Sequence, residues 1–161
     1  MRIFLAIVFF LIINMGHMQA VAADAGKNRL FGSWLYSCKS EYCFLSQSVA
    51  TEADYKKTVL GITIGKQQGK LHILFRFTAY AVPGRGIGLI LGPDQEWHLP
   101  ITKCDKRICE SGSFLDPVVL DAMKKNDKMT FTFHHNNGKY LAYPVSLMGL
   151  SDAVDLLVRT P

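Results

Sequence analysis

The sequence lacks an apolar run long enough to cross a membrane. Its longest such run, Ile3 to Ile13, holds eleven residues, which at about 1.5 Å per helical residue cover roughly 17 Å of a ~30 Å hydrocarbon core. Arg2 precedes the run, and the cleavage-type motif Ala20-Val21-Ala22 follows it. This pattern is typical of a signal peptide. We therefore predict a leader over residues 1–22, a single domain over residues 23–161, and no integral membrane span after cleavage.

Recognisable catalytic and metal-binding motifs are also missing. No serine lies in a G-x-S-x-G elbow, and no histidine belongs to an H-E-x-x-H motif. The adjacent His134 and His135 fall on a predicted strand, where successive side chains point to opposite faces, and His72 and His98 stand alone. The glycines of residues 83–88 lead into a predicted strand rather than a helix, which argues against a dinucleotide fingerprint. We predict no catalytic residue, no metal and no cofactor.

Acidic residues are fewer than basic ones, 13 against 18, which gives a formal net charge of +5. The basic residues are spread along the chain instead of forming a stripe with aromatics, so we predict no nucleic-acid partner. A mild basic balance favours contact with an anionic surface. Lys103, Lys106 and Arg107 form the candidate binding cluster, and the alternative is that they are the solvated end of a hairpin.

Cysteine is scarce but regularly spaced. Cys38 and Cys43 have four residues between them, and so do Cys104 and Cys109. An exported chain meets oxidants, and this spacing favours two local disulfides, although four cysteines allow three connectivities. A zinc site with four cysteine ligands normally uses tighter C-x2-C knuckles, and the redox spacing C-x-x-C is absent. We predict two structural disulfides, each stabilising the fold by about 2 kcal/mol.

Alternation of apolar and polar residues is abundant. Leu71, Ile73, Phe75 and Phe77 share one face of an extended segment, which is the period of a half-buried strand. Asn137-Gly138 is a strong signal for a tight hairpin turn. Many short strands at this spacing are typical of a sandwich or barrel. We predict strands at residues 30–38, 42–49, 58–64, 71–78, 87–91, 96–101, 129–134 and 141–147.

Two short helices are predicted between and after these strands. Asp116 caps the first, with Pro117 at its opening position. Ser151 caps the second near the C-terminus. Trp34, in a strand beside the first cysteine pair, is predicted to lie in the core, as buried tryptophans of sandwiches often do. Trp97 is predicted to be either a core residue or a partner contact.

Motifs at both ends of the domain carry a family resemblance. Phe31-Gly32-Ser33-Trp34 leads to the first cysteine pair, Val82-Pro83-Gly84 opens a turn, and residues 145–154 read Val-Ser-Leu-Met-Gly-Leu-Ser-Asp-Ala-Val. In combination with the two cysteine pairs, these motifs resemble the invasion-associated locus B family of exported bacterial proteins. The likeness covers nearly all of residues 23–161. Ser33 departs from the pattern, since an acidic residue is common at that place in the family, and both cysteine loops are short.

The resemblance implies a mainly β, immunoglobulin-like β-sandwich with two short helices, located in the periplasm or at the cell surface, and no established catalytic residue. It also implies a non-enzymatic binding module that contributes to host-cell invasion or virulence through an envelope or host-cell protein that the sequence does not identify. The alternatives are a periplasmic housekeeping, assembly or inhibitor protein with an indirect effect on invasion, and an enzyme whose site no motif reveals.

Overall fold

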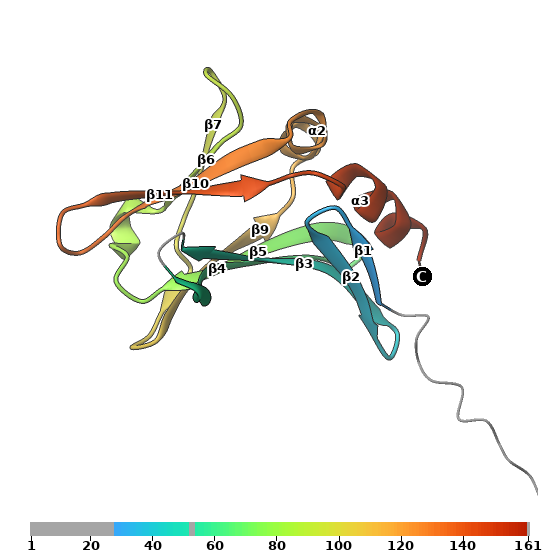
Figure 1. Cartoon of the computed structure of the whole chain (residues 1–161), viewed down its shortest axis with the longest axis horizontal. Helices are drawn as coiled ribbons and strands as arrows, with labels where there is room; N and C mark the ends of the chain where they lie inside the picture. Colours follow the sequence, from blue (N-terminus) through green and yellow to red (C-terminus); the bar gives the residue numbers. More distant parts are fainter. Residues whose placement is uncertain (1–27, 52–53, 161) are drawn as a thin grey trace, which may run out of the picture.

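Two antiparallel sheets make up most of the molecule (Figure 1). The structure, a computed structural model, describes residues 28–51 and 54–160, so the predicted leader lies outside the described residues. The larger sheet has seven strands in the order β1 (Asn28–Phe31), β2 (Trp34–Lys39), β3 (Tyr42–Thr51), β4 (Asp54–Gln67), β5 (Lys70–Thr78), β9 (Ile108–Phe114) and β8 (Lys103–Cys104). The smaller sheet has four, in the order β11 (Tyr140–Ser146), β10 (Lys128–His134), β6 (Ile87–Ile90) and β7 (Glu96–Leu99). The predicted β-sandwich is confirmed.

The core forms where the inner faces of the two sheets meet. Phe75 and Phe77 of β5 point at Phe131 and Phe133 of β10, with ring centroids of Phe75 and Phe131 5.4 Å apart and those of Phe77 and Phe131 5.1 Å apart. All four side chains are at most 2% exposed. Trp34 is fully buried, as predicted. The alternation read from the sequence thus supplies the apolar inner layer that a sandwich needs.

One predicted strand is split in two. Residues 30–38 contain the end of β1 and nearly all of β2, which are joined by a tight turn at Gly32 and Ser33, with Phe31 paired to Trp34. Gly32 has a φ of +54°, which only glycine adopts without strain. The prediction of one continuous strand was wrong because the turn is only two residues long and apolar residues, Phe31 and Trp34, flank it on both sides.

Strand β9 was not predicted at all. Its sequence, Ile-Cys-Glu-Ser-Gly-Ser-Phe, places serine where apolar residues would mark a core face. Ser111 is nevertheless fully buried, and its hydroxyl donates a hydrogen bond of 2.8 Å to the carbonyl oxygen of Pro100. A satisfied hydroxyl costs little to bury. This strand therefore carries no hydrophobic alternation that a sequence reading can detect.

The two helices differ in how well their starts were predicted. Helix α2 (Pro117–Lys125) begins as expected, since the Asp116 carboxylate accepts a hydrogen bond of 2.7 Å from the Val118 amide. Helix α3 (Leu150–Arg159) begins earlier than predicted, with Gly149 at its cap position, so Ser151 lies inside the helix and the predicted serine cap was wrong. The helix packs against β1, β2 and β3 at one end of the sandwich (Figure 1).

Residues from both ends of the domain meet beside α3 and form what we term the terminal clasp: Gly32, Ser33, Ser146, Met148 and Gly149. The Ser33 amide donates to the Met148 carbonyl oxygen at 3.1 Å, and the Ser33 hydroxyl donates to the Ser146 hydroxyl at 2.9 Å. A Cβ added to Gly32 would lie 2.3 Å from the Met148 oxygen, and one added to Gly149 would lie 2.3 Å from the Phe31 oxygen. Two glycines therefore permit the close backbone contact that joins the two ends.

Both disulfides link directly facing residues at the ends of hairpins. Cys38 of β2 bonds to Cys43 of β3, and Cys104 of β8 bonds to Cys109 of β9. The local pairing favoured by the spacing is the pairing found, and it leaves no free cysteine in the described chain.

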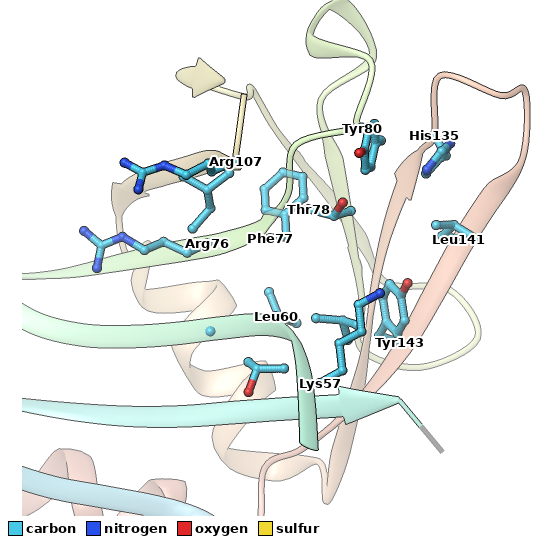
Figure 2. A pocket seen from close by; sticks show the side chains of 14 residues that line it. Lys57, Leu60, Arg76, Phe77, Thr78, Tyr80, Arg107, His135, Leu141 and Tyr143 are labelled. Carbon is cyan, nitrogen blue, oxygen red and sulfur yellow. The ribbon is translucent and has the colours of Figure 1, made fainter. Parts of the chain in front are cut away.

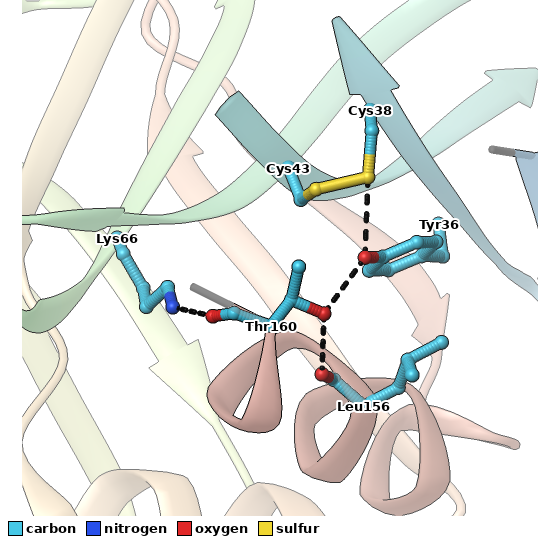
Figure 3. The surroundings of a disulfide bond; sticks show 6 residues. All are labelled: Tyr36, Cys38, Cys43, Lys66, Leu156 and Thr160. Atoms are coloured by element: carbon cyan, nitrogen blue, oxygen red, sulfur yellow. Dashed lines mark hydrogen bonds between the residues drawn. A yellow bond between two sulfur atoms is a disulfide. The ribbon is translucent and has the colours of Figure 1, made fainter. Parts of the chain in front are cut away.

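The first disulfide also lies next to the C-terminal residues (Figure 3). The Tyr36 hydroxyl lies 3.1 Å from Cys38 Sγ and 2.9 Å from Thr160 Oγ1. Because Thr160 donates its own proton to the Leu156 carbonyl oxygen at 3.0 Å, Tyr36 is the donor to Thr160. Lys66 Nζ donates to the Thr160 carbonyl oxygen. These contacts attach the end of α3 to β2 and to β4.

Candidate functional site

A cleft of about 650 Å³ opens between the two sheets at the end of the sandwich that carries the β10–β11 hairpin, away from α3 (Figures 1 and 2). Its walls come from residues 57–61 of β4, the last residues of β5 with Tyr80, the β8–β9 hairpin, His135 just after β10, and β11. This volume lies within the range of typical ligand pockets, about 300–1,000 Å³. We refer to it as the end cleft.

The floor of the end cleft is apolar. Leu60 and Phe77 are buried core residues whose side chains reach the cleft, and Ile108, Leu141 and Tyr143 are half-buried around them. The floor exists because inward-facing residues of β4, β5 and β11 run to the end of the sandwich, where neither α2 nor α3 covers them. A ligand with an apolar group would remove this surface from water.

The rim of the end cleft is cationic. Lys57, Arg76 and Arg107 come from three different elements, and His135 and Tyr80 stand opposite with ring centroids 5.5 Å apart. None of the described lining residues is an aspartate or glutamate. In Figure 2 the Arg76 and Arg107 side chains point to the same side, whereas the Lys57 side chain points toward Tyr143.

One of these cations already has a partner. Arg76 Nε lies 2.8 Å from Glu110 Oε1, and the two side chains are 52% and 23% exposed. Exposed ion pairs of this kind contribute little, about 0–1 kcal/mol, because water screens them. The pair reduces the positive charge at Arg76, so Lys57 and Arg107 carry more of the unbalanced charge of the described rim.

The loop that carries Arg107 is held in a fixed turn. Asp105 Oδ1 accepts hydrogen bonds from the amides of Arg107 at 2.7 Å and Ile108 at 3.0 Å. These two bonds, and the nearby Arg107 guanidinium, hold the pKa of the Asp105 carboxyl below its ordinary value. A lowered pKa means that this contribution to stability is present above the ordinary pKa of an aspartate and is lost as the pH falls through the lowered value. The turn is therefore intact at neutral pH.

The three residues of the predicted binding cluster lie on one hairpin and differ in their relation to the end cleft. Lys103, Lys106 and Arg107 are all exposed, but only Arg107 lines the end cleft. Lys103 lies on β8 opposite Glu110, and Lys106 lies at the tip of the hairpin. Whether the three act as one cluster stays a prediction.

The sequence reading missed the other residues of the cleft. Lys57, Arg76, Tyr80, His135 and Tyr143 are spread over almost ninety positions of the chain and share no motif. They come together only because β4, β5 and β11 end at the same side of the sandwich. A weak signal was available, since each falls at or near the end of a predicted strand, where loops and binding residues concentrate.

A second hollow, of about 380 Å³, lies between β7, the end of β9 and the start of α2. Its lining is largely apolar and includes Trp97. Trp97 is half-buried, which is intermediate between the two predicted alternatives, a core residue and an exposed partner contact.

In the part of the chain that the structure describes, no group of three or more His, Cys, Asp or Glu side chains is placed to hold a metal ion. The carboxylate near His98 is that of Glu96, whose Oε1 lies 3.6 Å from His98 Nε2. The end cleft is the stronger candidate because it combines volume with charge.

Comparison with known proteins decides the family. The model of the invasion-associated locus B (IalB) protein family matches residues 34–158. The chain belongs to the IalB family. The resemblance drawn from the end motifs and the cysteine pairs is thereby confirmed. No curated protein matches the chain.

A solved structure of the same family shares the fold. The crystal structure of invasion associated protein B from Bartonella henselae superposes with a TM-score of 0.72, covers 81% of this chain and 95% of that chain, and is 14% identical in sequence. At this identity the likeness concerns the fold alone. The two disulfides together with IalB membership indicate an extracytoplasmic location. Among the described residues, no helix is long and apolar enough to span a bilayer.

The second disulfide should stabilise the β8–β9 hairpin that carries Arg107 in this IalB protein. We expect the double substitution Cys104→Ser with Cys109→Ser to lower the free energy of unfolding by about 2 kcal/mol, because the unfolded chain gains the freedom of the opened ring. Urea denaturation of the wild type and the variant, both with Cys38 and Cys43 oxidised, measures the difference. A variant as stable as the wild type would show that the hydrogen-bonded turn at Asp105 holds this hairpin unaided.

Proposed function

We propose that this IalB protein is an exported, non-enzymatic binding module of the bacterial envelope that holds an anionic partner in the end cleft. The observation that carries the proposal is a cationic rim, with Lys57 and Arg107 exposed, above an apolar floor in a cleft of about 650 Å³. Concave sites with apolar walls and a few polar groups are the usual form of ligand sites. The cationic rim selects for negative charge on the partner.

Export is the second part of the proposal, with residues 1–22 as a cleaved leader and residues 23–161 as the mature domain. It is supported by two disulfides, which form and persist outside the cytoplasm. The first strand begins at Asn28, so a cut after Ala22 leaves every described strand in place. N-terminal sequencing of the protein from a periplasmic fraction and from the culture medium tests the cut and distinguishes the periplasm from secretion. Recovery of the uncut chain would contradict this part.

Substitutions at the rim test the binding role. We expect Lys57→Glu combined with Arg107→Glu to weaken retention of the folded, oxidised domain on its partner about tenfold or more at low salt. The double reversal replaces two attractive charges by two repulsive ones, and the effect should shrink as salt screens it. The partner is sought by measuring retention of the domain on isolated bacterial envelopes and on intact host cells.

Lys106→Glu provides the matched control. It makes the same change of charge in the same loop, but Lys106 lies outside the end cleft. We expect it to change retention by less than about twofold, because an exposed charge outside the contact contributes little. Equal losses for the control and for Arg107→Glu alone would contradict the cleft and favour the exposed cluster of Lys103, Lys106 and Arg107.

The contribution to host-cell invasion is tested in a deletion strain complemented with the wild type or the double variant. A defect seen only with host cells, and restored only by the wild type, supports a direct role. A growth defect in plain medium under envelope stress would favour the housekeeping, assembly or inhibitor role instead.

A further inference from the structure

We infer that the end cleft takes a short acidic peptide segment of a partner protein, with one apolar side chain on the floor and carboxylates at the rim. The inference rests on the proposed binding function and names the chemistry of its ligand. It follows from the placement of the charges, the apolar floor, and the hydroxyl groups that line the cleft.

The charges are spaced for more than one anionic group. Lys57 is on β4 and Arg107 is in the β8–β9 hairpin, and both line the end cleft. In Figure 2 the Lys57 side chain points toward Tyr143, while the Arg107 guanidinium points the other way, to the same side as Arg76. A ligand with a single anionic head, such as a fatty acid, would engage one of these positions. Carboxylates at successive residues of a chain can reach both.

The floor calls for an apolar group between those carboxylates. Leu60 is fully buried and Phe77 is 2% exposed, so both belong to the core, yet both line the end cleft together with half-buried Leu141. Sulfated glycans offer negative charge but no aliphatic or aromatic side chain to cover such a floor. An acidic peptide with a phenylalanine, leucine or isoleucine supplies both features.

The polar groups beside the floor suit a peptide backbone. The hydroxyls of Thr58, Thr78, Tyr80 and Tyr143 belong to lining residues, and a hydroxyl both donates and accepts hydrogen bonds. Peptide amides and carbonyls need partners of both kinds when a segment leaves water. These hydroxyls line the same cleft as the cationic side chains, so a bound segment can meet both.

Fluorescence anisotropy with two synthetic peptide pools tests the inference on the oxidised domain of residues 23–161. Both pools are fluorescein-labelled hexapeptides rich in Asp and Glu; one carries a central Phe, Leu or Ile, and the other carries a central Ser. We expect the apolar pool to bind at least about tenfold more tightly, because the buried side chain removes apolar area from water. A sulfated oligosaccharide is the third probe.

Three variants locate the binding. We expect Arg107→Glu to weaken the apolar pool roughly five- to tenfold at low salt and Lys106→Glu to leave it unchanged. Thr58→Glu places a negative charge inside the end cleft from an exposed position, so it should weaken the pool without disturbing the core. Circular dichroism of each variant checks that it is folded.

The outcomes separate the two proposals. Tighter binding of the apolar pool, lost in Arg107→Glu and Thr58→Glu but not in Lys106→Glu, supports the inference. Equal affinity for the two pools overturns the inference, because the apolar side chain then contributes nothing to binding. Arg107-dependent binding of the oligosaccharide alone overturns it too, because the ligand is then not a peptide. Both outcomes leave an anion-binding cleft. If no probe binds but retention on envelopes or host cells still depends on Lys57 and Arg107, the peptide is wrong and the binding function stands. If that retention is also independent of both residues, both proposals fail.

Discussion

Replacing Gly149 with alanine is expected to lower the free energy of unfolding by more than about 3 kcal/mol. Gly149 has a φ of +83°, a conformation that costs other residues about 1–2 kcal/mol. An added Cβ would also lie 2.3 Å from the Phe31 carbonyl oxygen and 2.7 Å from the Gly32 nitrogen. Both contacts are with backbone, which cannot rotate away, so the terminal clasp must open. Its hydrogen bond from Ser33 to Met148 would then be lost as well.

Gly138→Ala is the matched control for this experiment. Gly138 has nearly the same φ, +85°, but an added Cβ would meet nothing within 4 Å. We expect it to lower the free energy of unfolding by only about 1–2 kcal/mol, the cost of the conformation itself. Urea denaturation of the two variants under oxidising conditions gives the difference, which isolates the close approach at the clasp. Equal losses would mean that the clasp contributes nothing beyond backbone conformation.

Phe131→Ala is expected to be the most damaging substitution in the core, at about 3–5 kcal/mol. Phe131 is fully buried and lies against aromatic rings of both sheets, with centroid distances of 5.4 Å to Phe75, 5.1 Å to Phe77 and 6.0 Å to Phe133. Truncation leaves a cavity at the junction of the sheets and removes the edge-to-face and stacked contacts. The surrounding residues belong to paired strands, so they cannot collapse to fill it.

Phe114→Ala is the corresponding control outside the core. Phe114 is 49% exposed on β9 and contacts His72 at a centroid distance of 5.8 Å. We expect a loss of less than about 1.5 kcal/mol, since much of the ring is already in water. The midpoints and slopes of guanidinium denaturation for both variants measure the two losses. A Phe131 variant no less stable than the Phe114 variant would contradict a core organised around this residue.

The family motifs at the two ends of the domain contact each other in the terminal clasp. Phe31-Gly32-Ser33-Trp34 and Val145 to Leu150 stand at opposite ends of the domain, yet Ser33 bonds to both Ser146 and Met148. Gly32 and Gly149 are the positions where the two backbones touch. The motifs that carry the resemblance to the IalB family therefore lie at a structural junction, distant in the fold from the end cleft.

Local chemistry explains why parts of the fold were predictable. Alternation at residues 71–78 and 129–134 marked β5 and β10, because an inner sheet face must be apolar along each strand. Asp116 and Pro117 marked the start of α2, because an N-cap and a fixed φ act within one turn. The cysteine spacing indicated local bridges, because the facing residues of a hairpin are close in sequence.

The sequence by itself determined the class of the fold and the family, and it favoured the local pairing of the cysteines. These follow from residues that are near each other or from a pattern repeated along the chain. Only the tertiary structure decided the rest: the turn that splits β1 from β2, the buried serine of β9, and the end cleft, which Arg107 lines and Lys103 and Lys106 do not. Each depends on contacts between distant segments, and a hydrophobic period carries no information about which strand ends meet across a sandwich.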